Sequence, residues 1–240
     1  MVRSNTMTVR SIEGLGRLFL YPEGIMSRGL FIVLEGGEGT GKTTIANWLT
    51  VRLGHHRRTA EEVADPGTSV LGLKLRELVK DKDIPMSPEQ QMVLYTAARM
   101  SLAEEIEMKL AAGTDVVSGR WVLSTRVYQG IMGHIPMAQI DAMHSMYVKL
   151  NPDVCILLDC PAELGLARKQ QDAGVGAMQQ DRWDSKDVAW HTQLRAAYQY
   201  VAEQAGYPIV DASQMLPKVQ ADVIDACKKN VRFVKELGDF

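Results

Sequence analysis

Short apolar runs alternate along the chain with longer segments in which apolar residues recur at helical spacing. The runs at residues 30–34, 154–158 and 207–211 are bounded by glycine or acidic residues, which is typical of strands buried on both faces. Residues 115–118 predict a further short strand. The segments with helical spacing cover residues 42–53, 70–80, 88–112, 136–150, 162–170, 185–205 and 216–229. Strands separated by such helices predict an α/β fold whose parallel sheet is wound by right-handed crossovers.

The chain shows no internal repeat and no change of composition that would mark a second domain. We therefore expect one domain at residues 26–230, which includes a polar lid without periodicity at about 171–183. The remaining segments are an N-terminal extension at residues 1–25 and a C-terminal tail at 231–240. The extension lacks an apolar period and is expected to be disordered, although its scattered arginines leave a transit peptide as the alternative.

The net charge and the cysteine content limit which binding partners and which cellular compartment we expect. A net charge of −2 provides no excess of Lys and Arg for a nucleic acid polymer, and no apolar run approaches the ~18 residues of a membrane span. Cys155, Cys160 and Cys227 form no C-x-x-C pair, so buried thiols in a reducing compartment fit better than disulfides or zinc. We expect a cytoplasmic protein without a polymer or membrane partner.

Residues 36–43 read Gly-Gly-Glu-Gly-Thr-Gly-Lys-Thr and fit the P-loop pattern G-x-x-x-x-G-K-[ST] completely. The motif follows an apolar strand and opens a predicted helix, so glycine N–H groups and the helix N-terminus can surround a phosphate. Lys42 would reach the β- and γ-phosphates of ATP, and the Thr43 hydroxyl would hold Mg²⁺. The predicted ATP-binding residues here are Gly36, Gly37, Glu38, Gly39, Thr40, Gly41, Lys42, Thr43 and Thr44.

A P-loop predicts nucleotide binding but does not define the reaction. A GTPase would carry an N-K-x-D motif and a D-x-x-G switch, and neither is present. A motor ATPase would usually be larger and have a strand ending in Asp-Glu, which is also absent. The short alternating units favour a small-molecule kinase.

From about residue 29 to residue 229 the chain resembles the thymidylate kinases, a family of P-loop nucleoside monophosphate kinases. The matching segments, in order, are residues 30–43, Asp65-Pro-Gly67 with Leu75-Arg76, Tyr95-Thr-Ala-Ala-Arg99, Gly119-Arg-Trp121 with Ser124-Thr-Arg-Val-Tyr-Gln-Gly130, Leu158-Asp-Cys-Pro-Ala-Glu163 and Val210-Asp-Ala-Ser-Gln214. The resemblance implies a P-loop NTPase-type three-layer fold, with a five-stranded parallel sheet flanked by helices. It also implies a homodimer that uses ATP and Mg²⁺ to convert dTMP to dTDP.

The resemblance further implies which residues bind the acceptor nucleotide. Arg76 and Arg120 would clamp its 5′-phosphate, a task that suits a guanidinium fork. Tyr95 would stack on the pyrimidine, and Tyr128 would crowd the 2′ position of the sugar. The implied acceptor-binding residues are Glu38, Asp65, Arg76, Tyr95, Arg99, Arg120, Thr125 and Tyr128, and those beside the donor adenine are Ser213 and Gln214.

The variable positions of the P-loop carry no cation, so cations elsewhere, chiefly in the lid, must stabilise the negative charge of the transition state. In the lid, Asp181-Arg-Trp-Asp184 is similar to the family's D-R-x-E pattern, which makes Arg182 the first candidate and Arg168 the second. The predicted catalytic residues are Lys42, Arg120, Arg182 and Arg168.

Three departures from the family pattern keep alternatives open. Gly119 stands where the family has an aspartate that helps to place Mg²⁺, and Glu35 or Asp159 would have to take over that role. The Asp65-Pro-Gly67 segment lacks the family's second glycine. Ala64 stands just before it in place of an arginine. One alternative is a kinase for dUMP, dCMP or several deoxynucleotides. The other is a degenerate nucleotide-binding regulatory protein, which the intact P-loop disfavours.

Overall fold

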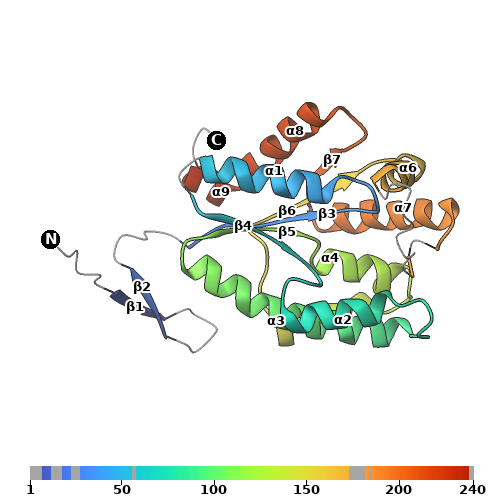
Figure 1. Cartoon of the computed structure of the whole chain (residues 1–240), viewed down its shortest axis with the longest axis horizontal. Helices are drawn as coiled ribbons and strands as arrows, with labels where there is room; N and C mark the ends of the chain where they lie inside the picture. The colour runs from blue at the N-terminus through green and yellow to red at the C-terminus, as the bar shows by residue number, and fades with distance from the viewer. Residues whose placement is uncertain are drawn as a thin grey trace.

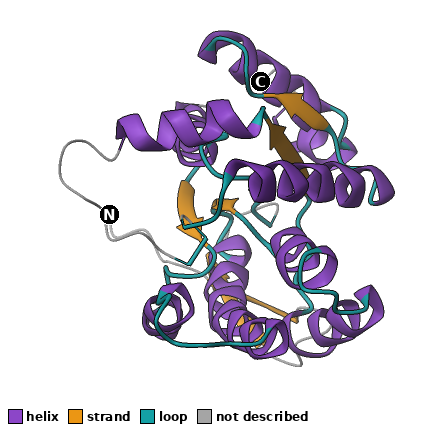
Figure 2. Ribbon diagram, turned by 90° about the vertical axis from the view of Figure 1, so that its right-hand side faces the viewer, coloured by secondary structure: helices purple, strands orange, loops and turns teal. Residues whose placement is uncertain are grey.

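The computed structural model describes residues 7–11, 18–22, 28–55, 58–172, 182–183 and 185–237. Its main sheet is parallel, with five strands in the order β4-β5-β3-β6-β7. The strands are β3 (Phe31–Glu35), β4 (Ala60–Ala64), β5 (Asp115–Gly119), β6 (Val154–Asp159) and β7 (Ile209–Asp211). Helices cover both faces of this sheet (Figures 1 and 2), which confirms the predicted three-layer α/β fold.

The helices occupy the connections between the strands. They are α1 (Lys42–His55), α2 (Val70–Lys80), α3 (Pro88–Ala111), α4 (Val122–Thr125), α5 (Met137–Met143), α6 (Ala162–Asp172), α7 (Val188–Gln204), α8 (Leu216–Lys228) and α9 (Val231–Leu237), with π-helical turns η1 (Arg126–Ile131) and η2 (His144–Val148). In Figure 1, α1, α8 and α9 lie on one side of the sheet, and α2 and α3 lie on the other.

Strand β3 separates two hydrophobic clusters because its side chains alternate between the faces of the sheet. Ile32 and Leu34 pack with residues of α1 and α8 on one face. Phe31 and Val33 pack with residues of α3 on the other, where the ring of Trp121 meets Phe31 edge-on at 5.1 Å. All five residues of β3 are buried, which fixes the loop that follows it.

Most predicted helix boundaries match the structure, with one different cap. Ser87 and Gln90 form the expected capping box at the start of α3. The helix that was predicted to begin after Ser185 instead begins at Val188, because the Asp187 carboxylate accepts from the Trp190 N–H at 2.8 Å. The correction moves the N-cap of α7 by two residues, about half a turn.

Several elements were not predicted from the sequence. Strand β4 lies at the edge of the sheet and has only one buried residue, Val63, so it lacks an apolar signature. Residues 122–131 are helical, and the single helix expected at 136–150 is α5 followed by η2. The predicted C-terminal tail contains α9, whose Phe233 is fully buried.

The N-terminal extension contains β1 (Met7–Ser11) and β2 (Leu18–Pro22), which pair antiparallel as a separate two-stranded sheet. The rest of the extension lies outside the described residues, so its disorder stays a prediction. Of the predicted lid, residues 173–181 also lie outside them. Among the described helices, none combines the length and apolar character that a membrane crossing requires.

Candidate active site

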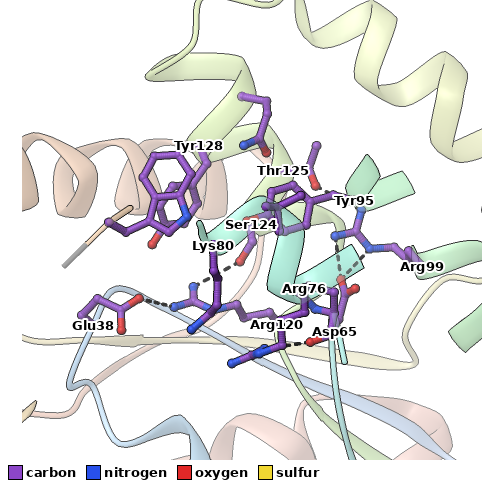
Figure 3. Close-up of a pocket in the computed structure, with 14 residues that line it drawn as sticks. Glu38, Asp65, Arg76, Lys80, Tyr95, Arg99, Arg120, Ser124, Thr125 and Tyr128 are labelled. Carbon is purple, nitrogen blue, oxygen red and sulfur yellow. Dashed lines mark hydrogen bonds and ion pairs between the residues drawn. The ribbon is translucent and has the colours of Figure 1, made fainter. Parts of the chain in front are cut away.

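Two adjoining cavities lie at the carboxyl ends of the parallel strands, where α/β sheets bind ligands. The larger, here called the P-loop cavity, has a volume of about 560 Å³ and is lined by residues 38–45 and by parts of β4, β5 and α6. The smaller, here called the inner cavity, measures about 120 Å³ (Figure 3). Four side chains line both cavities, and they are those of Glu38, Asp65, Arg76 and Arg120.

The P-loop has the geometry that its sequence predicts. Gly36, Gly39 and Gly41 have positive φ values of 144°, 65° and 84°. Such angles turn the backbone tightly before α1 begins at Lys42. The half-buried ammonium group of Lys42 donates to the carbonyl oxygens of Gly36 at 3.0 Å and Gly37 at 2.5 Å. Burial, reinforced by the nearby Arg120 cation, lowers the pKa of Lys42 to about 7.

Helix α6 approaches the P-loop closely through backbone atoms. A Cβ atom at Gly39 would lie 1.8 Å from the carbonyl oxygen of Gly165, and a Cβ at Gly165 would lie 2.3 Å from that of Glu38. Only two glycines allow this approach, because real Cβ atoms do not come so close to backbone oxygen. The contact brings the side chains of α6 next to the phosphate loop.

Glu38 joins cations from two separate elements. One carboxylate oxygen accepts from Arg120 at 2.7 Å, and the other accepts from Lys169 of α6 at 3.0 Å. Burial acts to raise the pKa of Glu38, but Arg120, Lys42 and Lys169 together hold it well below its usual value. The P-loop carboxylate is therefore ionised and holds the cations around it.

Arg120 lines both cavities, and Figure 3 shows its side chain beside Glu38 in the inner cavity. Its φ of 97° is a left-handed conformation that non-glycine residues rarely adopt. Its Nη1 donates to the Gly36 carbonyl at 3.0 Å and to the Tyr198 hydroxyl at 2.9 Å, and its Nη2 donates to Glu38. The guanidinium is thus fixed in one plane before any ligand arrives.

The inner cavity brings together four of the residues predicted to bind the base or the sugar of the acceptor nucleotide. Tyr95, Arg99, Thr125 and Tyr128 all line it. Arg99 is buried and donates to the Asp65 carboxylate at 2.6 Å and to the Thr125 hydroxyl at 3.1 Å. The second carboxylate oxygen of Asp65 is buried without a hydrogen-bond partner among the described residues, and burial raises the pKa of Asp65.

Arg76 reaches the same region from α2. Its Nη1 donates to the carbonyl oxygen of Pro66 at 2.7 Å, and its side chain passes over Gly67. A Cβ at Gly67 would lie 2.9 Å from the Arg76 Cδ. The single glycine of the Asp65-Pro-Gly67 segment therefore makes room for this arginine.

Arg182 lies apart from the residues that line the P-loop cavity. Its guanidinium donates to the carbonyl oxygens of Asp81 at 2.6 Å and Ile84 at 2.5 Å, just beyond the end of α2. A further bond reaches the Val79 carbonyl at 3.2 Å. In this arrangement Arg182 anchors the C-terminal end of the predicted lid to the end of α2.

The other residues predicted to lie near ATP, the phosphoryl donor, form two groups in the structure. Arg168 lines the P-loop cavity and donates to the Ala212 carbonyl at 2.8 Å, and Thr43, Thr44 and Gln214 line it as well. The Ser213 hydroxyl instead turns back to Asp211 at 2.5 Å, and Ser213 does not line this cavity.

The sequence reasoning missed several residues that the structure places at the site. They are Lys80, Ser124, Gln129, Trp183 and Tyr198. Ser124 and Gln129 belong to a recognised motif, and Trp183 directly follows a predicted arginine, so a closer inspection of neighbours could have found them. Tyr198 lies in a helix without any motif, and nothing in the sequence pointed to it.

The residues around Thr43 suit Mg²⁺, which keeps most of its waters and takes few protein ligands. The Thr43 side chain lines the P-loop cavity, and no group of three acidic, histidine or cysteine side chains suited to a metal gathers within the described ranges. The suggested substitutes for the missing aspartate are engaged elsewhere. Asp159 pairs with Arg195 at 2.8 Å, and Glu35 accepts from backbone and side-chain donors inside the core.

Comparison with known proteins agrees with this geometry. The family model described as thymidylate kinase matches residues 34–223. The thymidylate kinase of Rhodopseudomonas palustris (strain BisB18) is 34% identical over 220 residues, which cover 89% of this chain and 95% of that protein. That of Marinomonas sp. (strain MWYL1) is 35% identical over 207 residues, 84% of this chain and 95% of its own. With the P-loop, the shared cations and the inner cavity in place, the chain belongs to the thymidylate kinase family.

Proposed function

We propose that this protein transfers the γ-phosphoryl group of ATP to dTMP, giving ADP and dTDP. The observation that carries the proposal is the position of Arg120, which lines both the P-loop cavity and the inner cavity. A cation at this junction can bind the acceptor phosphate and stabilise charge on the group in transfer. Membership of the thymidylate kinase family supports dTMP as the acceptor.

Catalysis then consists of positioning and charge neutralisation, without a covalent intermediate. Lys42 leaves its loop carbonyls for the β- and γ-phosphates, and Arg76 and Arg120 hold the acceptor phosphate. The Asp65 oxygen without a partner is available to a donor on the acceptor nucleotide. Tyr95 and Tyr128 supply the aromatic walls of the inner cavity.

Mg²⁺ fits as the metal, with the Thr43 hydroxyl as its protein ligand and with water and ATP oxygens completing the shell. When bound, it neutralises charge on the phosphates. Of the described acids that line the P-loop cavity, Glu38 pairs with Arg120 and Lys169 and Asp65 pairs with Arg99, so Glu62 is our choice to accept from the metal's waters.

Among the lid-side cations, Arg168 and Lys169 are better placed than Arg182. The first two lie on α6 and line the P-loop cavity. Arg182 would have to leave three carbonyl oxygens to reach a transferring phosphoryl group. We retain Arg182 as a proposed catalytic residue and place it behind the two cations of α6.

We also propose a homodimer that works in the cytoplasm. Val93, Met100 and Met108 are exposed on α3 at spacings of seven and eight residues, which gives that helix an uncovered apolar stripe. Helix α2, which packs on α3, adds exposed Leu71 and Leu78. The cytoplasm is supported by the cysteines, which are three free, buried thiols.

A coupled assay for ADP release across the nucleoside monophosphates tests the proposal. We expect turnover with dTMP, much weaker turnover with dUMP and dCMP, and loss of activity in Lys42→Ala with the fold retained. Equal rates with several deoxynucleotides would favour a broad kinase. ATP binding without turnover on any acceptor would favour the regulatory alternative.

A further inference from the structure

The Tyr198 side chain is almost fully buried beside the active site but lines neither the P-loop cavity nor the inner cavity. It lies on α7, and its hydroxyl is 2.9 Å from Arg120 Nη1 and 2.8 Å from the Ser124 hydroxyl. The Ser124 hydroxyl in turn donates to a carboxylate oxygen of Glu35 at 2.6 Å. Four polar side chains therefore form one continuous chain that ends at a cation of the site.

With Glu35 ionised, the chemistry of these groups fixes the direction of every hydrogen bond. Arginine can only donate, so Arg120 donates to the Tyr198 oxygen. Ser124 has a single hydroxyl hydrogen, which goes to Glu35, so the Tyr198 hydroxyl must donate to Ser124. The other Glu35 oxygen accepts the N–H groups of Trp121 at 2.7 Å and Ser124 at 3.2 Å. Each of these contacts requires the Glu35 carboxylate as an acceptor.

Arg120 needs such a support because its backbone conformation does not determine where the guanidinium group points. Four acceptors lie within hydrogen-bond distance of the guanidinium, and they are the Gly36 carbonyl, the Glu38 carboxylate, the Tyr198 hydroxyl and, at 3.4 Å, the Ser124 hydroxyl. The first two belong to the P-loop, which rearranges its contacts when phosphates displace the Lys42 ammonium from the loop carbonyls. The other two acceptors lie outside the loop, and of these Tyr198 makes the shorter contact, at 2.9 Å, from a helix that lines neither the P-loop cavity nor the inner cavity.

We propose that Tyr198 is a positioning residue for phosphoryl transfer, and that the ordered relay Arg120–Tyr198–Ser124–Glu35 keeps the Arg120 guanidinium aimed at the junction of the two cavities. The inference rests on the role proposed above for Arg120. It assigns a function to a tyrosine that touches neither substrate. It also gives the buried carboxylate of Glu35 a purpose, because that carboxylate sets the direction of the relay.

Tyr198→Phe removes one oxygen and leaves the packing of the ring intact. Arg120 then loses an acceptor in a buried site, so we expect kcat for dTMP phosphorylation to fall by on the order of 10- to 100-fold. The KM for dTMP should rise, whereas the KM for ATP and the melting temperature should change little. The matched control is Tyr200→Phe, which removes a hydroxyl from an exposed tyrosine of the same helix and should leave all four quantities unchanged.

Glu35→Gln reverses the relay without shortening it. The amide oxygen keeps the two backbone donors, and the amide nitrogen must donate to Ser124, which then donates to Tyr198 and competes with Arg120. We expect a loss of kcat similar to that in Tyr198→Phe. The double variant should be no slower than the slower single variant, because both changes break the same relay.

The results separate the relay from the role of Arg120. An Arg120→Ala variant with wild-type kinetics would refute the proposed role of Arg120 itself. An inactive Arg120→Ala beside a Tyr198→Phe with wild-type kcat and KM for dTMP would overturn the relay alone. Losses that multiply in the double variant would also contradict it, since two independent structural defects multiply and one broken relay does not.

Discussion

At the scale of single residues, Lys42 has a charge that depends on what its site contains. Without phosphates its ammonium group lies on two loop carbonyls, and burial lowers its pKa to about 7. Phosphate oxygens stabilise the charged form and raise that pKa again. A solution above neutral pH therefore holds a partly neutral Lys42 that becomes charged when ATP binds.

We expect MgATP binding at pH 8 to take up about one proton, and the affinity to weaken as the pH rises above 7. Calorimetry in two buffers with different enthalpies of ionisation measures the uptake. Lys42→Arg stays charged at every accessible pH, so this control should bind without uptake. Binding of the wild type without a proton would show that Lys42 is already fully charged in the free protein.

Gly119 is a second residue whose surroundings lead to a prediction. An added Cβ would have the Lys42 Cβ at 4.0 Å as its nearest neighbour, and the φ of Gly119 does not lie in the left-handed region. A side chain is therefore accommodated without strain. A carboxylate here would face the P-loop cavity, where it can accept from metal-bound water.

Gly119→Asp should lower the Mg²⁺ concentration for half-maximal rate several-fold, since outer-shell partners commonly change metal affinity by about 10- to 100-fold. A magnesium titration of dTMP phosphorylation checks this. Gly119→Asn has nearly the same shape without the charge and should shift the titration much less. Identical curves for the two variants would rule out a carboxylate effect.

The sequence predicted site residues well where a short motif carries them. Sequence reasoning could assign Arg76, Tyr95 and Thr125 to the site because each lies within a few residues of a recognisable motif. In the structure, the inner cavity is lined by all three. Arg182 also lies in a motif, yet its long side chain has bonded to the end of α2, a choice that only the folded neighbourhood decides. Tyr198 was out of reach because its partner Arg120 is 78 residues away.

At the scale of elements, the contact between α6 and the P-loop depends on two glycines. Gly165→Ala favours the helix by up to about 1 kcal/mol. It also places a Cβ 2.3 Å from the Glu38 carbonyl oxygen, so α6 must move away. The displacement would separate Lys169 from the P-loop carboxylate.

We therefore expect Gly165→Ala to lower kcat at least tenfold, because small misplacements of catalytic groups are costly, with little change in melting temperature. Gly54→Ala is the matched control, since Gly54 lies in α1 and an added Cβ meets nothing within 4 Å. Parallel measurements of turnover and thermal unfolding decide the matter. Wild-type turnover in Gly165→Ala would show that α6 moves freely against the loop.

Elements whose pattern reflects burial were the predictable ones. Strand β6 is apolar almost throughout because helices cover both of its faces. Strand β4 reads Ala-Glu-Glu-Val-Ala, and at the edge of the sheet its pairing with β5 comes from backbone hydrogen bonds that leave no mark on the side chains. The π-helical turn η2 ends at Val148, and Lys149, which caps it, has a φ of 62°, where spacing alone predicts continuing helix.

At the scale of the whole molecule, the apolar stripe on α3 predicts association. The double variant Met100→Glu/Met108→Glu places two charges in the proposed interface and should convert a dimer to monomers in sedimentation velocity. Met146→Glu charges a methionine on η2 that is more exposed than either of these and should leave the dimer intact. A wild-type chain that sediments as a monomer at micromolar concentration would exclude this interface.

The left-handed backbone of Arg120 has a consequence for how the protein responds to selection. A non-glycine residue at a φ of 97° costs the fold about 1–3 kcal/mol. A directed-evolution screen that rewards heat resistance alone would therefore enrich glycine at this position and discard the cation at the junction of the two cavities. Libraries made for thermostable variants should hold position 120 constant and vary other positions. Otherwise they will select a more heat-resistant protein that no longer catalyses phosphoryl transfer.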